Sequence, residues 1–423
     1  MFNKKSVDIA VLGAGPAGLI AAHVLADRGM NFELLDRAES SHTHSYALAL
    51  HPDTLELLDT LGIIAPILDQ SFPIKRATLF DENHKQRAVI DYGQLLAKHP
   101  YLAVIGQDKL ETILVKTLAE KGHKPKWHHR VRCIQPSSTG VHFTVDRLGE
   151  GMTGYAIAHM EREIDKIFEY DVEYLIAADG HASMARKAAD ISFPEIKSNL
   201  DYLIFELETN TRALTEMRLM LDGDKTHIYW PLSKDRCRFS FQKPNGFAMT
   251  QASDDDGWQE STMSHSEPEV SNADLDHLLH EHAPWFVGSS RDVKWRAKAC
   301  FEKRIADSFG SGRIWLVGDA GHMAPPAGVL SMNVGMLEAA DLANTISAKI
   351  TPEERQSNLD EYNYSRVCEW RRLLDIDQNV TSSDPKADWL MEHRGNIIGN
   401  IPASRQSLSQ ILSQLNLCET AAD

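Results

Sequence analysis

The feature that most constrains this chain is a glycine pattern close to its N-terminus, at residues 13–18. A short apolar run, Val7–Leu12, predicts a buried strand that ends at Gly13, and the run Leu19–Arg28 predicts a helix after Gly18. The first glycine permits the tight turn, the second lets a pyrophosphate approach the backbone, and the third lets helix and strand pack closely. The helix N-terminus offers free N–H groups to phosphates. The stretch therefore predicts a dinucleotide-binding turn.

An acidic residue at the end of the next expected strand strengthens this interpretation. The apolar run Asn31–Leu35 ends in Asp36, close to the spacing at which an acid binds the ribose of a dinucleotide. A glycine pattern by itself is a weak signal, and an ordinary glycine turn of another α/β protein is the competing interpretation. Because a strand precedes the glycines, a helix follows them and an acid ends the next strand, the sequence favours nucleotide binding.

Composition and charge argue against several other classes of protein. The chain has 423 residues, of which 43% are hydrophobic, so it can bury the cores of about two or three domains. Its formal net charge of -16 gives no general attraction to nucleic acid or anionic membranes. The five cysteines form no C-x-x-C pair, and no apolar run is long enough to span a membrane. We therefore expect no nucleic-acid partner, no secretory signal, no transmembrane segment and a cytoplasmic location.

Two polar segments are expected to be loops rather than sites. His42 and His44 lie in the polar segment 40–45, but no third metal ligand follows nearby, so we expect no metal centre. The stretch Asn245–Asp274 is polar, acidic and poor in aliphatic residues. It has too little apolar surface to form core, and we expect a mobile surface loop there.

Two further strand ends carry an acid beside a glycine. The run Val172–Ala178 predicts a buried strand that leads into Asp179-Gly180, and the run Arg313–Val317 leads into Gly318-Asp319. A loop rich in proline and glycine, residues 325–331, follows the second pair, and a long alanine-rich helix follows the loop. The chain thus places three chemically suggestive turns, each at the end of an expected strand.

The three motifs, in this order, resemble those of the group A flavoprotein monooxygenases, whose type member is p-hydroxybenzoate hydroxylase. The resemblance implies an α/β fold in which a Rossmann-like FAD-binding domain is interleaved with an antiparallel-sheet substrate domain and followed by C-terminal helices. The run Tyr202–Gln242, with several expected strands, fits the substrate sheet. The implied FAD-binding segments are 1–72, 100–190 and 292–350, the substrate domain is 73–99 and 191–291, and the C-terminal helical segment is 351–423.

The same resemblance assigns residues to an FAD site. The glycine turn would face the pyrophosphate, with Asp36 and Arg37 at the adenosine ribose. Asp319 would bind the ribityl chain, and Asp179-Gly180 matches a motif associated with both FAD and NAD(P)H. The helix expected from about Met332 would direct its positive end at the flavin edge that gains negative charge on reduction. The cofactor-binding candidates are Gly13, Gly15, Pro16, Ala17, Gly18, Asp36, Arg37, Gln107, Asp179, Gly180, Gly318, Asp319, Pro326, Gly328, Met332 and Asn333.

Two positions depart from the family pattern. Tyr46 stands where an arginine is usual, and Val329-Leu330-Ser331 stand where the flavin loop is usually richer in glycine. In the family both positions touch the flavin. The departures therefore bear on how mobile the ring is and how hydride reaches it, and not on whether the FAD site exists.

The resemblance implies an NAD(P)H-dependent monooxygenase. In this family NAD(P)H reduces FAD, reduced FAD reacts with O₂, and a flavin C4a-hydroperoxide transfers one oxygen atom to an aromatic or electron-rich small molecule. No catalytic side chain is assigned, and His322 is expected to be structural or close to the flavin. The reaction requires a dry cavity. Candidate walls are Tyr229 and Trp230, which a sheet core would explain equally well, and Pro325. We expect a monomer or homodimer.

Three alternative functions share the same fold or cofactor. A flavin-dependent halogenase would require Gly-Trp-x-Trp-x-Ile-Pro, but this chain has Ile228-Tyr229-Trp230-Pro231 without paired tryptophans. An FAD-dependent reductase is the second alternative. The third is a non-catalytic FAD protein that binds a partner through its acidic surface.

Overall fold

The computed structural model describes residues 3–41, 48–149, 164–209, 214–243, 272–287, 292–378, 380–382, 384 and 388–419. Tyr46, His42 and His44 lie outside these residues, as does the expected loop Asn245–Asp274 up to residue 271. Among the described residues, none of the helices combines the length and the apolar character needed to cross a membrane.

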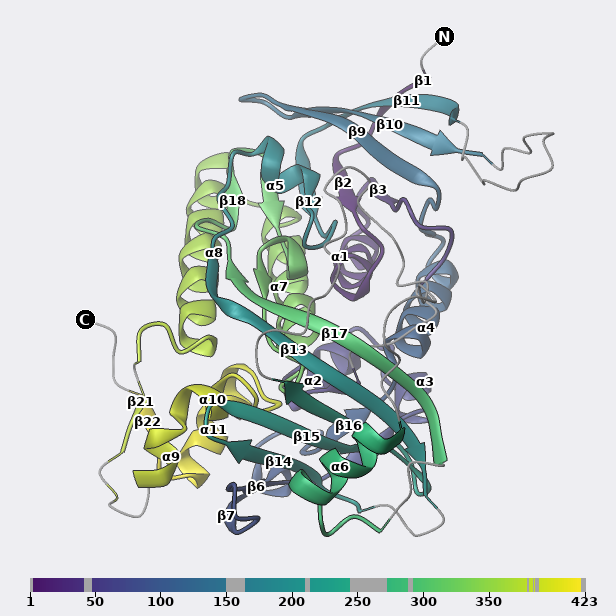
Figure 1. Cartoon of the computed structure of the whole chain (residues 1–423). Helices are drawn as coiled ribbons and strands as arrows, with labels where there is room; N and C mark the ends of the chain where they lie inside the picture. Colours follow the sequence, from purple (N-terminus) through teal and green to yellow (C-terminus); the bar gives the residue numbers. More distant parts are fainter. Residues whose placement is uncertain are drawn as a thin grey trace, which may run out of the picture.

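A five-stranded sheet, in the order β18-β19-β12-β2-β3, forms the centre of the nucleotide-binding part (Figure 1). Its parallel strands are wholly or almost wholly buried, as expected of a sheet covered on both faces. They come from three distant stretches of the chain: β2 (Ile9–Leu12), β3 (Phe32–Leu35), β12 (Tyr174–Ala177) and β19 (Ile314–Leu316), with the antiparallel edge strand β18 (Gly310–Ser311).

Helices from equally distant stretches pack together beside this sheet. The helix α1 (Pro16–Asp27) packs against α7 (Leu330–Ile346) and α4 (Gln107–Glu120), and α8 (Pro352–Leu373) packs on α7. The alanine-rich sequence of α7 lets its neighbours approach closely, and most of its residues are buried. The start of α7, two residues before the expected Met332, therefore lies beside the start of α1.

Two smaller sheets extend the nucleotide-binding part. One has the order β1-β11-β10-β9 and lies at the top of Figure 1. It contains β1 (Asn3–Ser6), β9 (His129–Pro136), β10 (Val141–Leu148) and β11 (Ile164–Val172). The other joins β4 (Ala49–Leu50), β8 (Leu102–Val104) and β5 (Phe72–Ile74), near the short helices α2 (Pro52–Thr60) and α3 (Ala65–Leu68).

An eight-stranded sheet forms the second large layer, with the order β20-β17-β13-β16-β15-β14-β6-β7 (Figure 1). All neighbouring pairs are antiparallel except β14 with β6. The strands are β6 (Arg76–Phe80), β7 (Gln86–Asp91), β13 (Glu195–Glu208), β14 (Met217–Asp222), β15 (Lys225–Pro231), β16 (Arg236–Lys243), β17 (Val293–Ile305) and β20 (His322–Met323).

The two faces of this sheet contact different parts of the protein. Leu219, Ile228 and Trp230 belong to the large core shared with the nucleotide-binding part. Their neighbours along the strands, such as Tyr229, point to the opposite face and pack with the helix α6 (Asn272–His282). The alternation follows from the two-residue period of a strand. We call these the inner and outer faces of the sheet.

The C-terminal segment packs against α2 and against β7 of the large sheet. It contains α9 (Asp388–Glu392), α10 (Arg394–Ile398), α11 (Arg405–Gln414) and the strand pair β21 (Val380–Thr381) and β22 (Cys418–Glu419). The Gln414 amide bonds both the backbone N–H and the carbonyl of Asp91, and the Tyr92 hydroxyl donates to the Pro402 carbonyl. The predicted fold class is confirmed. The predicted domain boundaries stay a prediction.

We expect Thr351→Ala to lower the free energy of unfolding by about 1 kcal/mol, the usual contribution of an N-cap side chain. The hydroxyl of Thr351 accepts the Glu354 N–H at 3.2 Å, and the Glu354 carboxylate accepts the Thr351 N–H at 2.9 Å, so the two residues cap α8 reciprocally. Denaturant unfolding measures the loss. Thr351→Ser keeps the accepting oxygen and is the matched control; an equal loss in both variants would contradict the assignment.

Candidate functional site

The glycine turn after β2 is packed on two sides and open on the third. A Cβ at Gly13 would lie 2.0 Å from the Ala178 carbonyl oxygen, and a Cβ at Gly18 would lie 1.9 Å from the Gly13 carbonyl oxygen. A Cβ at Gly15 would meet no atom within 4 Å. Two of the glycines are thus needed for packing, while the backbone at the third can be approached by another molecule.

The helix that follows this turn presents an uncapped N-terminus. Helix α1 begins with Pro16 and Ala17, and within the described part of the chain no side chain caps it at Gly15. Proline suits the first position because its missing N–H would be unpaired there. The remaining free N–H groups of the first turn and the helix dipole suit a phosphate.

Asp36 ties the end of β3 to the glycine turn. One oxygen of its carboxylate accepts the Ala14 N–H at 2.6 Å, and the other accepts the Ala38 N–H at 2.7 Å. The next residue, Arg37, has its pKa lowered by burial, while the carboxylates of Asp36 and Asp179 counteract this effect. The structure therefore brings together acids that lie far apart in the sequence.

Asp179 uses one oxygen of its carboxylate and leaves the other unpaired. Oδ2 accepts the N–H groups of Met184 at 2.8 Å and Ala185 at 3.2 Å, at the start of the short helix α5 (Met184–Ala188). Oδ1 is buried without a hydrogen-bond partner among the described residues. Burial raises the pKa of Asp179. A buried unpaired acceptor at the end of a parallel strand is available to a bound ligand.

Arg186 connects the turn at Asp179 with the turn at Asp319. Its guanidinium donates to the Ala320 carbonyl at 2.8 Å and to the His181 carbonyl at 2.7 Å. The side chain is almost fully buried and also stacks over Phe193, with its guanidinium carbon 3.9 Å from the ring centroid. The three expected turns therefore form one connected unit at the ends of the parallel strands.

Asp319 faces open space inside this unit. Its side chain is exposed, yet the protein around it raises its pKa by desolvation, and the charges of His322 and His181 counteract that rise. Its neighbour Gly318 lies between the two helices: a Cβ there would be 3.1 Å from the Ala17 Cβ, and a Cβ at Gly335 of α7 would be 2.8 Å from the Gly318 Cα. Asp319 is thus held near the first turn of α1.

These features fit FAD. The open approach at Gly15, the uncapped start of α1, the unpaired oxygen of Asp179 and the exposed acid of Asp319 supply the contacts that a dinucleotide with a polar sugar chain needs. Gly180 has a φ of 81°, so the turn beside Asp179 also requires glycine.

Hydrogen bonds of the Asn333 side chain fix the loop that follows Asp319. The Asn333 carboxamide accepts the His51 N–H at 2.8 Å and donates to the carbonyls of Ala49 and Val329, both at 2.9 Å. His51 in turn bonds the Gly328 carbonyl through Nε2 at 2.8 Å, and burial lowers the pKa of His51 to about 3. The side chain of Asn333 thus positions the loop, which also contains Pro326 and leads to the half-buried Met332.

A buried acid on α7 supports the turn that carries Asp319. Glu338 is fully buried and accepts the Gly318 N–H at 3.1 Å and the Trp370 indole N–H at 2.6 Å; its Oε2 lies 2.9 Å from His322 Nε2. The rings of His322 and Trp370 stack with centroids 3.7 Å apart. Glu338 is not among the residues predicted from the sequence; its signal is an acid that directly follows the apolar residues Met336 and Leu337 of α7.

Gln107 begins α4, and its amide donates to the Glu111 carboxylate at 2.8 Å. A cleft of about 400 Å³ opens beside this helix start and the segment after Asp36. Its lining residues are Ser40, Ser41, Gln70, Asp108, Lys109, Thr112 and Ile113. All of its lining residues except Ile113 are polar or charged, and Gln107 directly precedes the lining residue Asp108.

The candidate substrate residues do not share one surface. Trp230 is buried in the core of the inner face, whereas Tyr229 is buried on the outer face with Phe239 and Trp285. The Tyr229 hydroxyl accepts the Leu214 N–H at 3.1 Å. Pro325 is buried in the loop before α7. Trp230 and Pro325 therefore remain candidates on the side of the FAD site, and Tyr229 lies on the other side of the sheet.

We expect Gly15→Ala and Gly18→Ala to fail in different ways. A methyl group at Gly15 occupies the open approach, so FAD binding should weaken while the fold is kept. A methyl group at Gly18 meets the Gly13 carbonyl at 1.9 Å, so the free energy of unfolding should fall by about 1–3 kcal/mol. FAD fluorescence titration and denaturant unfolding separate the two effects. Equal behaviour of the variants would show that the glycines have one common role.

Asp319→Ala should weaken FAD binding by about 1.5–3 kcal/mol, the range for a hydrogen bond to a charged group. Asp179→Ala should weaken it less, because one oxygen of Asp179 caps α5 and its loss acts mainly on stability. Titration of each apoprotein with FAD measures both affinities. Unchanged affinity in Asp319→Ala would remove the assignment.

The comparisons with known proteins agree with this geometry. Residues 6–376 match the family described as FAD binding domain. Pentachlorophenol 4-monooxygenase of Sphingobium chlorophenolicum is 26% identical over 88% of this chain and 64% of its own length. Anhydrotetracycline monooxygenase of Streptomyces rimosus is 26% identical over 97% of this chain and 76% of its own length. The chain thus spans less than two thirds of the first of these relatives.

Solved structures share the fold. A p-nitrophenol 4-monooxygenase from Pseudomonas putida has a TM-score of 0.69 at 19% identity, covering 97% of this chain and 99% of that one. The flavin-dependent monooxygenase PieE, solved with FAD and substrate, has a TM-score of 0.66 at 17% identity, covering 97% of this chain and 72% of its own. The chain belongs to the FAD binding domain family, in the p-hydroxybenzoate hydroxylase-like group that its three motifs resemble.

Proposed function

We propose that the protein is an NAD(P)H-dependent FAD monooxygenase that inserts one oxygen atom into an aromatic or similarly electron-rich small molecule. The overall reaction consumes NAD(P)H, a proton and O₂, and yields NAD(P)⁺, water and the hydroxylated substrate. The observation that carries the proposal is the meeting of the Gly15, Asp179 and Asp319 turns in one unit beside the inner face of the large sheet. Ligands of open α/β sheets bind at the ends of such strands.

The chain's own residues would bind and orient the cofactor. FAD, when bound, supplies the electron transfer from the nicotinamide and the activation of O₂. The glycine turn and the start of α1 would hold the pyrophosphate, Asp36 and Arg37 the adenosine ribose, and Asp319 the ribityl chain. Arg186 and Glu338 would keep the turns of Asp179 and Asp319 in place through the bonds described above.

The start of α7 would provide the electrostatic support for reduction. The helix begins at Leu330, directly after the loop that Asn333 and His51 hold. Its N-terminus carries a partial positive charge, which stabilises negative charge nearby. Because the loop is fixed by buried hydrogen bonds, this charge is positioned before the reaction begins, so no reorganisation is needed.

The substrate would lie between the loop and the inner face of the sheet. Trp230 and Pro325 are the wall candidates there, and their burial supports exclusion of water from the reaction. Pentachlorophenol 4-monooxygenase and p-nitrophenol 4-monooxygenase are named for phenolic substrates, which supports an aromatic substrate for this protein. We further propose O₂ as co-substrate, a cytoplasmic location, a monomer or homodimer, and the domain division given in the sequence analysis.

Substrate-stimulated NAD(P)H oxidation tests the proposal. A panel of phenols, including chlorinated, nitrated and polycyclic members, is incubated with the FAD-loaded protein under isotope-labelled O₂. We expect at least one member to accelerate NAD(P)H consumption and to yield a product that carries one labelled oxygen atom. Omission of O₂ is the matched control and should abolish the product.

Other outcomes point to the alternatives. FAD that is reduced only by a separate flavin reductase would favour the halogenase, and product formation without O₂ would favour the reductase. Absence of NAD(P)H oxidation with every member of the panel would favour a non-catalytic FAD protein. Each of these results would overturn the monooxygenase assignment.

A further inference from the structure

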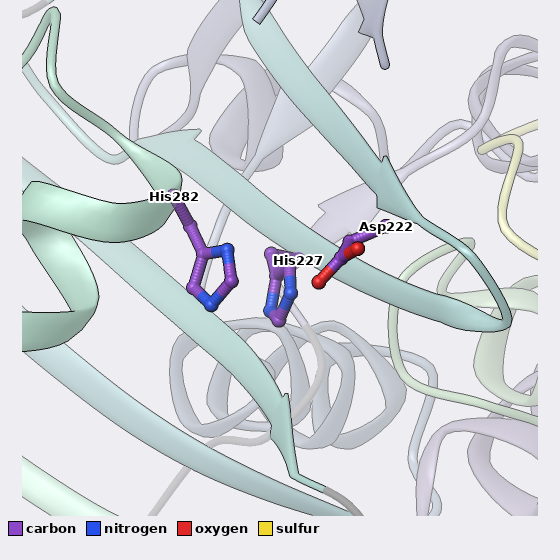
Figure 2. Close-up of side chains that lie close together, drawn as sticks. All are labelled: Asp222, His227 and His282. Carbon is purple, nitrogen blue, oxygen red and sulfur yellow. The ribbon is translucent and has the colours of Figure 1, made fainter. Parts of the chain in front are cut away.

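The outer face of the large sheet carries a cluster of potential metal ligands, away from the FAD site. Asp222 ends β14, His227 lies in β15 and His282 ends α6, and Figure 2 shows the three side chains gathered with His227 in the middle. One ligand atom of each residue lies within 4.8 Å of those of the other two. The β14–β15 hairpin and α6, which are separate in the sequence, therefore bring an acid and two imidazoles to one point.

His227 is the observation that indicates a ligand. Its side chain is 1% exposed, and neither ring nitrogen has a hydrogen-bond partner among the described residues. Buried polar atoms in folded proteins almost always have partners, and an unpaired pair of nitrogens destabilises the fold unless something binds them. The ring stacks on His282, with centroids 3.9 Å apart and planes at 22°, but stacking leaves the nitrogens free.

The donor set and its surroundings select the kind of ion. Two imidazoles and one carboxylate, with a further position for water, are a ligand set of zinc sites. Burial lowers the pKa of His227. The charges of Lys225 and Lys243 also act on His227. These lysines disfavour any cation, whereas the two imidazoles favour a transition-metal ion over Ca²⁺ and Mg²⁺, which prefer oxygen ligands.

The geometry requires the three ligands to move closer together. Zinc lies about 2.0–2.2 Å from nitrogen and oxygen ligands, so two ligands of a tetrahedral ion are roughly 3.4 Å apart. The cluster, within 4.8 Å, must therefore contract by up to about 1.4 Å. Asp222 and His282 are both partly exposed and can rotate, whereas His227 is fixed by the core. The C-terminal end of α6 carries a partial negative charge, which also favours a cation.

We propose that Asp222, His227 and His282 form a binding site for a divalent transition-metal ion of the zinc class, which fastens the end of α6 to the β14–β15 hairpin. The site is structural and does not depend on the proposed monooxygenase activity. It also departs from the absence of metal that the cysteine pattern and the His42–His44 segment suggest.

Metal titration of the FAD-loaded full chain tests the site, after removal of any affinity tag and treatment with a chelator. We expect one Zn²⁺ to bind per chain and to raise the Tm, and Co²⁺ to give visible absorption bands of a nitrogen-ligated ion. Asp222→Asn and His282→Ala should each weaken Zn²⁺ binding by at least about 10–100-fold, the loss seen even for outer partners of metal ligands. FAD content and circular dichroism verify folding.

His280→Ala is the matched control, because His280 is exposed on the same helix and does not belong to the cluster. Its Zn²⁺ affinity should equal that of the wild type. The proposal fails if the wild type binds Zn²⁺ no more tightly than Asp222→Asn, or if His280→Ala weakens binding as much as His282→Ala. Asp222→Asn decides the question even if His227 variants do not fold, since it keeps the shape of the side chain.

Discussion

The structure depends on one buried carboxylate, that of Glu338. Burial raises the pKa of this acid, but the charge and hydrogen bond of His322, with Arg366 and Trp370, lower it below its usual value. The charge is therefore kept inside the protein by its partners. Removal of one partner of such a group leaves a buried charge uncompensated, which is strongly destabilising. The Gly318 N–H donates to the same carboxylate, so the position of the turn that carries Asp319 depends on the Glu338 side chain.

Helix α7 carries the residues that fix both the loop and the turn beside the FAD site. Asn333 near its start holds the loop, Gly335 allows the close approach of Gly318, and Glu338 fixes the turn of Asp319. The three residues lie within two turns of one helix, so loop and turn cannot move independently. Val329, which precedes the helix with a φ of 50°, is held in a conformation that costs a β-branched residue energy. The surrounding hydrogen bonds maintain it.

Much of the fold could be predicted because its signals are local. The strands and helices around the three turns follow from the apolar period, proline and glycine. The hydrogen-bond partners of Glu338 could not be predicted, because Trp370 and His322 come from separate elements of the chain. The strand period predicts that Tyr229 and Trp230 face opposite ways, but tertiary packing decides which of them lies on the side of the FAD site. Tertiary packing also decides that the Asn333 side chain bonds the backbone of the protein itself. The cluster around His227 likewise forms only when α6 meets the sheet.

The segment from β13 to β17, which supplies five of the strands of the large sheet, begins and ends at neighbouring points, because Glu195 of β13 and Arg304 of β17 are paired in register. A segment whose two ends meet can be exchanged as one block without changing the path of the rest of the chain. Recombination between related genes would replace β13–β17 in a single event and leave β6 and β7 unchanged. Side chains from the two parent sequences would then meet at the β14–β6 strand pair, so poor packing between the parents would appear there.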